Sequence, residues 1–166
     1  MNESKGGGFA LLDAGPKGRG VFATRSFSAG VKVLVFRGPV VPTHLISDFT
    51  HTIQFDVGRF LGPSGGIDDY VNHSCDPTCA LRATPRRLAL VARRDIAPGD
   101  ELTFDYSTCL VDEPPLPVCH CGAPMCRGQV ASFWSLPPRT RKHLLAAGAV
   151  PSFVLGRHRA RVNARA

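Results

Sequence analysis

The segments of this chain that favour β-strands are short, and glycine or proline turns separate them along most of the sequence. Residues 31–37, 52–56 and 88–92 are rich in β-branched, aromatic or other apolar side chains. In residues 97–100, Ala-Pro-Gly-Asp, proline and glycine stand where a type II turn requires them. The strands do not alternate with helices as a doubly wound sheet demands. The pattern therefore predicts a mostly β protein built from small, irregular sheets.

One helix is predicted, late in the chain, over residues 139–147. Leu136-Pro137-Pro138 precedes it and Gly148 follows it, which is the usual punctuation of a helix. Leu144 and Leu145 are expected to face inward. The nearby Phe133 and Trp134 leave two alternatives open, because they could close a binding channel or simply pack the helix.

Length and composition indicate one globular domain. The chain has 166 residues, of which 43% are hydrophobic and 20% charged, so one real core is expected. No apolar run approaches the ~20 residues that a membrane-spanning helix needs. The polar, glycine-rich residues 1–8 resemble neither a signal peptide nor an anchor. The formal charge of +7 lies partly in an arginine-rich tail, so it favours a basic surface over a dedicated nucleic-acid site.

Three of the six cysteines stand in Cys119-x-Cys121-x4-Cys126, and Gly122 and Pro124 allow the tight turn that one shared ion would require. Without a secretion signal, this spacing favours a metal site over a disulfide framework. A structural Zn²⁺ site takes four ligands, usually thiolate or imidazole. The segment supplies three, and the residues alone leave the fourth open between five candidates: Cys75, Cys79, Cys109, His73 and His120.

Four segments of the chain carry a family resemblance. They are 17–23 (KGRGVFA), 70–77 (YVNHSCDP), 99–106 (GDELTFDY) and 119–128 (CHCGAPMCRG). In this order they resemble the signature segments and the post-SET segment of the SET-domain protein lysine methyltransferases. The resemblance implies a β-clip (SET) fold, in which small twisted sheets surround a pseudoknot. In that pseudoknot, residues 101–106 would thread beneath the loop 72–75.

The same resemblance implies a linear organisation. Residues 9–110 would form the SET domain, 111–118 a linker, 119–128 the post-SET zinc segment and 129–155 a helical C-terminal extension. We expect residues 1–8 and the basic tail 156–166 to be disordered, because neither offers enough apolar surface to bury.

The implied methyl donor is S-adenosylmethionine. In the family, the turn that here reads Lys17-Gly18-Arg19-Gly20 contacts this cofactor through main-chain atoms, and it is not a Rossmann fingerprint. The side chain of Asn72 would hold the amino-acid end of the cofactor, and His73 would contact the adenine mainly through its backbone. Two departures stand out: Arg19 replaces a frequent tryptophan, and Thr78 replaces an asparagine, which is expected to weaken local hydrogen bonding.

Methyl transfer from a sulfonium to a lysine amine is an in-line displacement that needs a neutral amine. Free lysine has a pKa near ~10.4, and an apolar channel favours its neutral form. The resemblance assigns the catalytic role to Tyr106, whose hydroxyl would lie beside the transferring methyl; the alternative is a structural tyrosine at a strand end. It assigns the channel to Phe36, Leu81 and Phe104. None has a hydroxyl, although Phe36 stands where the family commonly has tyrosine, and this predicts di- or trimethylation.

The resemblance also selects the fourth zinc ligand. In the family it comes from the first signature segment, so Cys75 would join Cys119, Cys121 and Cys126. Such a shared zinc would fix the post-SET segment over the active site.

The leading hypothesis is therefore a protein-lysine N-methyltransferase. Two alternatives stay open: a catalytically silent SET-like binding module, for which Phe36 is the best support, and a basic nucleic-acid-binding zinc protein. The resemblance implies a basic protein or peptide substrate, such as a histone tail, bound as an extended strand between residues 43–69 and the post-SET segment. We expect no membrane partner, no required nucleic acid, and a soluble intracellular protein of the cytoplasm or chromatin. The sequence does not name the substrate protein, the oligomeric state or the role of Tyr70.

Overall fold

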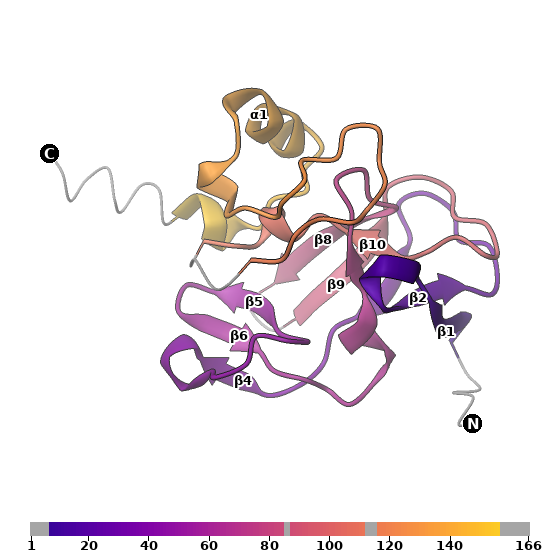
Figure 1. Ribbon diagram of the computed structural model, residues 1–166, viewed down its shortest axis with the longest axis horizontal. Helices are drawn as coiled ribbons and strands as arrows, with labels where there is room; N and C mark the ends of the chain where they lie inside the picture. Colours follow the sequence, from indigo (N-terminus) through magenta and orange to yellow (C-terminus); the bar gives the residue numbers. More distant parts are fainter. Residues whose placement is uncertain (1–6, 85–86, 112–115, 157–166) are drawn as a thin grey trace, which may run out of the picture.

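The computed structural model describes residues 7–84, 87–111 and 116–156, and short strands dominate it (Figure 1). The strands are β1 (Phe9–Asp13), β2 (Arg19–Ala23), β3 (Lys32–Val35), β4 (Val40–Pro42), β5 (Ile53–Asp56), β6 (Arg59–Leu61), β7 (Asn72–His73), β8 (Cys79–Thr84), β9 (Arg87–Ala92) and β10 (Thr103–Phe104). Within the described ranges the labelled α-helix is α1 (Pro138–Ala146), and residues 152–156 are also helical. The 3₁₀ turns are η1 (Gly15–Lys17), η2 (Thr43–Leu45), η3 (Ile67–Tyr70), η4 (Tyr106–Thr108) and η5 (Phe133–Ser135).

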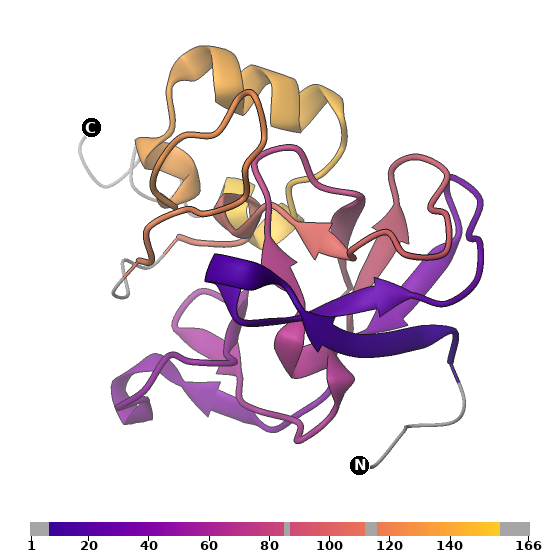
Figure 2. The same ribbon diagram turned by 45° about the vertical axis from the view of Figure 1, so that its right-hand side comes forward.

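The strands form four separate small sheets. These are the antiparallel pair β1–β2, the three-stranded sheets β3–β9–β8 and β4–β6–β5, and the parallel pair β7–β10. The β4–β6–β5 sheet and α1 lie at opposite ends of the molecule, with β8 and β9 between them (Figures 1 and 2). The predicted mostly β architecture of small sheets is confirmed. That residues 101–106 thread beneath the loop 72–75 stays a prediction.

Four strands, β4, β6, β7 and β8, were not anticipated from the sequence pattern. β4 and β6 have only three residues each, too few to show a periodicity. β8 contains a single β-branched residue, Thr84, yet it pairs with β9 over its whole length, from Cys79 opposite Ala92 to Thr84 opposite Arg87. Tertiary pairing, rather than local propensity, therefore makes β8 a strand.

The main hydrophobic core lies on the β3–β9–β8 sheet. Along β9, Leu88 and Leu90 are fully buried, and Leu81 of β8 and Leu102, just before β10, complete the layer. The alternation of buried and less buried residues in β9 matches the two-residue period of a strand that covers a core with one face.

A second hydrophobic cluster attaches the C-terminal extension. It consists of Val111, Phe133, Leu136, Leu144 and Val154. Leu144 faces inward as expected, but the expectation was wrong for Leu145, which is 43% exposed. Successive residues of an α-helix point about 100° apart, so the narrow contact between α1 and the cluster admits only one of the two.

The two aromatic residues before α1 pack this extension. Phe133 is fully buried in the second cluster. The indole nitrogen Nε1 of Trp134 donates a hydrogen bond of 3.1 Å to the carbonyl of Val154. Of the two alternatives left open by the sequence, packing of the helix is the one the structure supports.

Parallel pairing of β7 with β10 brings the two signature segments together. Asn72 lies opposite Thr103 and His73 opposite Phe104. The backbone N–H of Ser74 continues the ladder with a hydrogen bond of 3.1 Å to the carbonyl of Phe104. Residues about thirty positions apart in the chain therefore form one unit.

Thr78 reinforces this unit. Its hydroxyl donates to the Glu101 carbonyl at 2.9 Å and accepts from the Thr103 N–H at 3.0 Å, while the Thr78 N–H donates to Thr103 Oγ1 at 3.2 Å. The expectation that threonine weakens local hydrogen bonding is therefore not met, because its hydroxyl serves two backbone groups at once.

Several predicted boundaries fall at the edges of the described residues. Residues 1–8 were predicted to be disordered, and residues 1–6 of this segment lie outside the described part of the chain. Gly8 is described, and its carbonyl accepts a hydrogen bond from the Thr24 N–H at 2.9 Å. Residues 112–115 of the predicted linker and 157–166 of the predicted tail also lie outside. In the part of the chain that is described, no helix has the length and apolar character to cross a bilayer.

We predict that Thr78→Val lowers the free energy of unfolding by about 1–3 kcal/mol, because it leaves two buried backbone groups without a partner. Thermal unfolding followed by circular dichroism measures this loss. Thr84→Val is the matched control, since the Thr84 hydroxyl makes one exposed contact of 3.3 Å with the Arg87 carbonyl. Equal melting temperatures for the two variants would contradict the prediction.

Candidate active site

A cavity of about 830 Å³ opens beside the β7–β10 pair. Its walls come from the glycine-rich turn before β2, from the β4–β6–β5 sheet with its connections, and from both signature segments. Seven of the predicted site residues line it: Lys17, Gly18, Arg19, Phe36, Asn72, Phe104 and Tyr106. Gly20, His73 and Leu81 are not among its lining residues.

One end of the cavity is polar. The amide nitrogen Nδ2 of Asn72 donates to the carbonyl of Arg19 at 3.0 Å and to Glu101 Oε1 at 2.9 Å. The ammonium of Lys17 forms an ion pair with the other carboxylate oxygen of Glu101. The predicted cofactor residues of the glycine-rich turn and of β7 are thus joined through Glu101. The sequence pattern did not mark Glu101 as a site residue, although it lies within the second signature segment.

Crowding around residue 20 explains why a glycine stands at this end of the cavity. A Cβ atom built at this position would lie 2.5 Å from Glu101 Oε1 and 2.9 Å from Asn72 Nδ2. Any larger residue would separate the turn from the Asn72–Glu101 pair. Gly20 therefore serves the site by letting backbone and side chains approach closely, without lining the cavity itself.

The other part of the cavity is aromatic. The rings of Phe36 and Phe104 meet edge to face with centroids 5.8 Å apart, and the Phe104 ring lies 4.8 Å from that of Tyr106. Leu81, the third predicted channel residue, is 1% exposed and belongs to the main core. The aromatic wall is therefore formed by Phe36, Phe104 and Tyr106.

Tyr106 is held by both its backbone and its hydroxyl. The hydroxyl donates a hydrogen bond of 2.7 Å to the carbonyl of Val71. Burial raises the pKa of this hydroxyl well above its ordinary value, so it keeps its proton at physiological pH. With the proton engaged by Val71, the lone pairs of the hydroxyl oxygen are available as an acceptor.

The ring of His73 has a structural role. Its Nδ1 accepts a hydrogen bond of 3.2 Å from the N–H of Tyr106, and its Nε2 lies 3.4 Å from Cys75 Sγ. Burial lowers the pKa of His73 to about 4, so the ring is neutral at physiological pH and carries its proton on Nε2, facing the sulfur. The ring thereby connects the tyrosine with the cysteine cluster.

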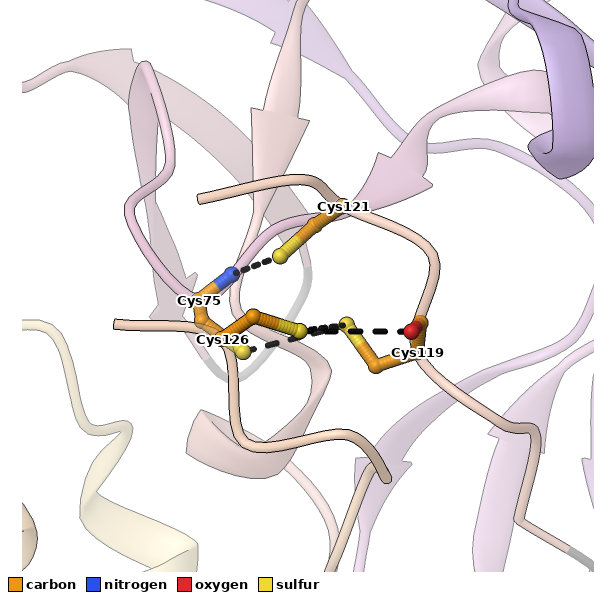
Figure 3. Close-up of side chains that lie close together, drawn as sticks. All are labelled: Cys75, Cys119, Cys121 and Cys126. Atoms are coloured by element: carbon orange, nitrogen blue, oxygen red, sulfur yellow. Dashed lines mark hydrogen bonds between the residues drawn. The ribbon is translucent and has the colours of Figure 1, made fainter. Parts of the chain in front are cut away.

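Four cysteine sulfurs converge next to β7, as Figure 3 shows. The Sγ atoms of Cys75, Cys119, Cys121 and Cys126 all lie within 4.8 Å of one another. Cys119 Sγ is 3.8 Å from Cys75 Sγ and 3.6 Å from Cys126 Sγ. Zn–S bonds of ~2.3 Å in a tetrahedron require sulfurs about 3.8 Å apart, so this group fits a structural Zn²⁺.

Backbone N–H groups also suit these sulfurs to a metal. The N–H of Arg127 points at Cys75 Sγ at 3.4 Å, that of Cys75 at Cys121 Sγ at 3.5 Å, and that of Gly128 at Cys126 Sγ at 3.4 Å. Such donors stabilise the negative charge that thiolate ligands carry. Of the five candidates for the fourth ligand, the structure places Cys75 in the group.

Cys79 and Cys109 lie apart in the main core. Burial raises the pKa of the Cys79 thiol to about 11 and that of Cys109 to about 12, so both remain protonated and chemically quiet.

A buried ion pair joins the cysteine segment to the second signature segment. The guanidinium of Arg127 donates two hydrogen bonds to the Asp105 carboxylate, at 2.9 and 2.7 Å, and the Asp105 side chain is fully buried. The sequence pattern did not predict this pair, although Arg127 directly follows Cys126 and Asp105 directly precedes Tyr106.

Comparisons with known proteins agree with this geometry. The SET domain family matches residues 18–107. Histone-lysine N-methyltransferase ATX2 of Arabidopsis thaliana is 32% identical over 148 residues, which cover 78% of this chain and 14% of that relative. The H3 lysine-4 specific histone-lysine N-methyltransferase of Saccharomyces cerevisiae is 46% identical over 70 residues, or 39% of this chain and 6% of the relative.

Solved structures show the same fold. The methyltransferase domain of human histone-lysine N-methyltransferase SETMAR superposes with a TM-score of 0.60 at 26% identity, covering 75% of this chain and 58% of that one. KRYPTONITE in complex with mCHH DNA, an H3(1-15) peptide and SAH gives a TM-score of 0.62 at 24% identity, covering 74% and 29%. The chain spans only a small part of the length of the two sequence relatives named above, 14% of one and 6% of the other.

We predict that the purified protein holds one zinc per chain and that Cys121→Ser loses it, because three ligands cannot close a structural site. Elemental analysis by mass spectrometry after chelator-free purification measures the stoichiometry. Cys79→Ser and Cys109→Ser are the controls and should keep the metal. Zinc-free wild-type protein would contradict the assignment.

Proposed function

This chain belongs to the SET-domain family, and from that membership we propose that it is a protein-lysine N-methyltransferase that uses S-adenosylmethionine. The observation that carries the proposal is a single cavity with the Asn72–Glu101–Lys17 network at one end and the Phe36, Phe104 and Tyr106 rings at the other. A polar end for the amino-acid part of a methyl donor and an aromatic channel for a lysine side chain are what this reaction needs.

At the polar end, the turn of residues 17–20 and the side chain of Asn72 would hold the methyl donor, and the backbone of His73 would contact its adenine. When bound, the donor supplies an electron-poor methyl group on a sulfonium. The Asn72 amide is already fixed by two hydrogen bonds, so the site is organised before binding. Such preorganisation reduces the entropy that binding costs.

At the aromatic end, apolar walls favour the neutral form of the target amine, because a charged ammonium gains no hydration there. Phe36 and Phe104 would align the amine with the methyl group, and alignment provides much of the acceleration of such a displacement. Tyr106 would act through its oxygen lone pairs on the methyl, not as a general base, because its hydroxyl keeps its proton.

The proposed substrate is a basic protein segment, such as a histone tail, bound as an extended strand. β5 is an edge of the β4–β6–β5 sheet, and its residues Ile53 and Gln54 line the cavity. A peptide could add to this edge by main-chain hydrogen bonds and still reach the channel with one side chain. The sequence relatives are named histone-lysine N-methyltransferases, which supports this choice of substrate. The same names support a place of action at chromatin.

The proposal keeps the predicted division of the chain: a SET domain over residues 9–110, a linker 111–118, a post-SET zinc segment 119–128 and an extension 129–155 with the tail 156–166. A zinc bound by Cys75, Cys119, Cys121 and Cys126 would serve structure alone, because all four ligands come from the protein and no open position remains for a substrate. The inclusion of Cys75 in the group argues against an independent nucleic-acid-binding zinc module.

Incubation with labelled S-adenosylmethionine and histone or other basic proteins tests the proposal. We predict that Asn72→Ala weakens cofactor binding about tenfold or more, by loss of hydrogen bonds to a charged group. Tyr106→Phe should leave binding nearly unchanged and lower turnover at least about tenfold, because the methyl loses its positioned oxygen. Titration calorimetry and initial rates separate the two effects.

Tyr70→Phe is the matched control for the tyrosine variant, because Tyr70 also lines the cavity and the family usually has phenylalanine there. Its turnover should stay close to that of the wild type. Full turnover by Tyr106→Phe, or normal cofactor binding by Asn72→Ala, would show that these roles are misassigned.

The channel predicts the number of methyl groups. A methylated amine must rotate and lose a proton before the next transfer, and Phe36 and Phe104 offer no hydroxyl that would hold it or a blocking water. We therefore predict di- or trimethyl-lysine, and Phe104→Tyr should shift the product toward fewer methyl groups without abolishing activity. Mass spectrometry of a peptide product over time measures this, and a wild-type reaction that stops at monomethyl-lysine would contradict it.

A further inference from the structure

Arg127 contacts both the cysteine group and the segment that carries Tyr106. It directly follows Cys126, and its backbone N–H points at Cys75 Sγ at 3.4 Å. Its guanidinium reaches Asp105 through two hydrogen bonds and Ser107 Oγ at 3.2 Å. One residue thus connects two of the four proposed zinc ligands with both sequence neighbours of the proposed catalytic tyrosine.

Asp105 fixes the start of the turn on which Tyr106 lies. Its carboxylate accepts the N–H of Ser107 at 3.1 Å, and its carbonyl accepts the Thr108 N–H at 2.9 Å and the Thr108 hydroxyl at 2.7 Å. The carboxylate is therefore both the cap of η4 and the partner of Arg127. A shift of this carboxylate would move the backbone of Tyr106.

The Arg127–Asp105 pair also lies next to the negative charge that a metal-bound cysteine group would carry. A Zn²⁺ ion with four thiolates has a net charge of −2, and Asp105 adds a buried negative charge close by. Arg127 is the cation between them, and its own side chain is only 17% exposed. Its Nε is buried with no hydrogen-bond partner among the described residues, so its orientation is set by the two-point contact with Asp105.

We propose that Arg127 is a positioning residue that transmits the geometry of the metal site to Tyr106 through Asp105. This rests on the proposed methyltransferase function, which it deepens. Closure of the zinc site places residue 127, the guanidinium then fixes Asp105, and Asp105 fixes the turn that presents the Tyr106 hydroxyl to the cavity. Lysine cannot replace arginine here, because a single ammonium cannot make both hydrogen bonds in one plane.

A neutral double variant separates positioning from simple charge balance. Asp105→Asn/Arg127→Met removes both charges of the pair, so neither partner is left buried and unpaired and the net charge around the cysteine group is unchanged; the fold should survive. We expect one zinc per chain and cofactor binding within about threefold of the wild type, but a kcat about 10²-fold lower, because small misplacements of reacting groups have effects of this size. Arg127→Lys should show the same separation of kcat from binding.

Chemical rescue adds an independent readout. Methylguanidinium should restore part of the turnover of Arg127→Ala, since it can rebuild the contact with the Asp105 carboxylate. It should not rescue Asp105→Asn/Arg127→Ala, in which the carboxylate is gone. Arg141→Met is the matched control, because the Arg141 guanidinium instead donates to the Trp134 carbonyl at 2.7 Å and should be dispensable for turnover.

The outcomes distinguish this inference from the proposed function. If the wild type transfers methyl groups and the neutral double variant does so at the wild-type kcat, Arg127 only balances charge and the inference is wrong. Loss of zinc or of the folding transition in all Arg127 variants would also overturn it, since the residue would then be needed for assembly. A wild type without any methyl transfer would contradict the proposed function and the inference together.

Discussion

The parallel contact between β7 and β10 is the interaction on which the rest of the site depends. It is only two residue pairs long, yet it places Asn72 beside Glu101 and His73 beside the backbone of Tyr106. Two paired residues could not hold strands together alone, because loop closure between them costs conformational entropy. The Thr78–Thr103 hydrogen bonds and the burial of Leu102 and Phe104 in the main core supply the missing stabilisation.

From this pair, the cavity divides into two chemically different parts. The Lys17–Glu101–Asn72 network presents charge and polar groups in a place only partly open to water, and the aromatic rings of Phe36, Phe104 and Tyr106 form an apolar wall of the same cavity. An arrangement of this kind suits a reaction in which a charged donor meets a neutral nucleophile. One short stretch of the chain contributes to both parts. Glu101, before β10, belongs to the polar network, and Phe104 and Tyr106 belong to the aromatic wall.

The cysteine group extends this unit to the C-terminal part of the chain. Cys75 lies two residues after the end of β7, and the three other cysteines lie beyond the linker, so a shared metal would tie the extension to the site. The His73 ring and the Arg127–Asp105 pair both reach from the sulfurs toward Tyr106, and they lie side by side, with His73 Nδ1 3.7 Å from Asp105 Oδ1. The cysteine group and the cavity are therefore parts of one assembly.

The sequence by itself determined the local features: the short strands, the helix between Pro137 and Gly148, and three cysteines within reach of one ion. Its signature segments also identified six of the residues that line the cavity, because a motif preserves residue types in order: Lys17, Gly18, Arg19, Asn72, Phe104 and Tyr106. The family resemblance selected Cys75 as the fourth sulfur, and the tertiary structure brings it to the other three. Only the tertiary structure decided that Glu101 joins Lys17 to Asn72, that Leu81 lies in the core, and that Arg127 pairs with Asp105. These contacts span 44 residues from Cys75 to Cys119, 84 from Lys17 to Glu101 and 22 from Asp105 to Arg127. Propensity and spacing act over a few neighbouring residues, whereas contacts over such separations form only when the whole chain packs.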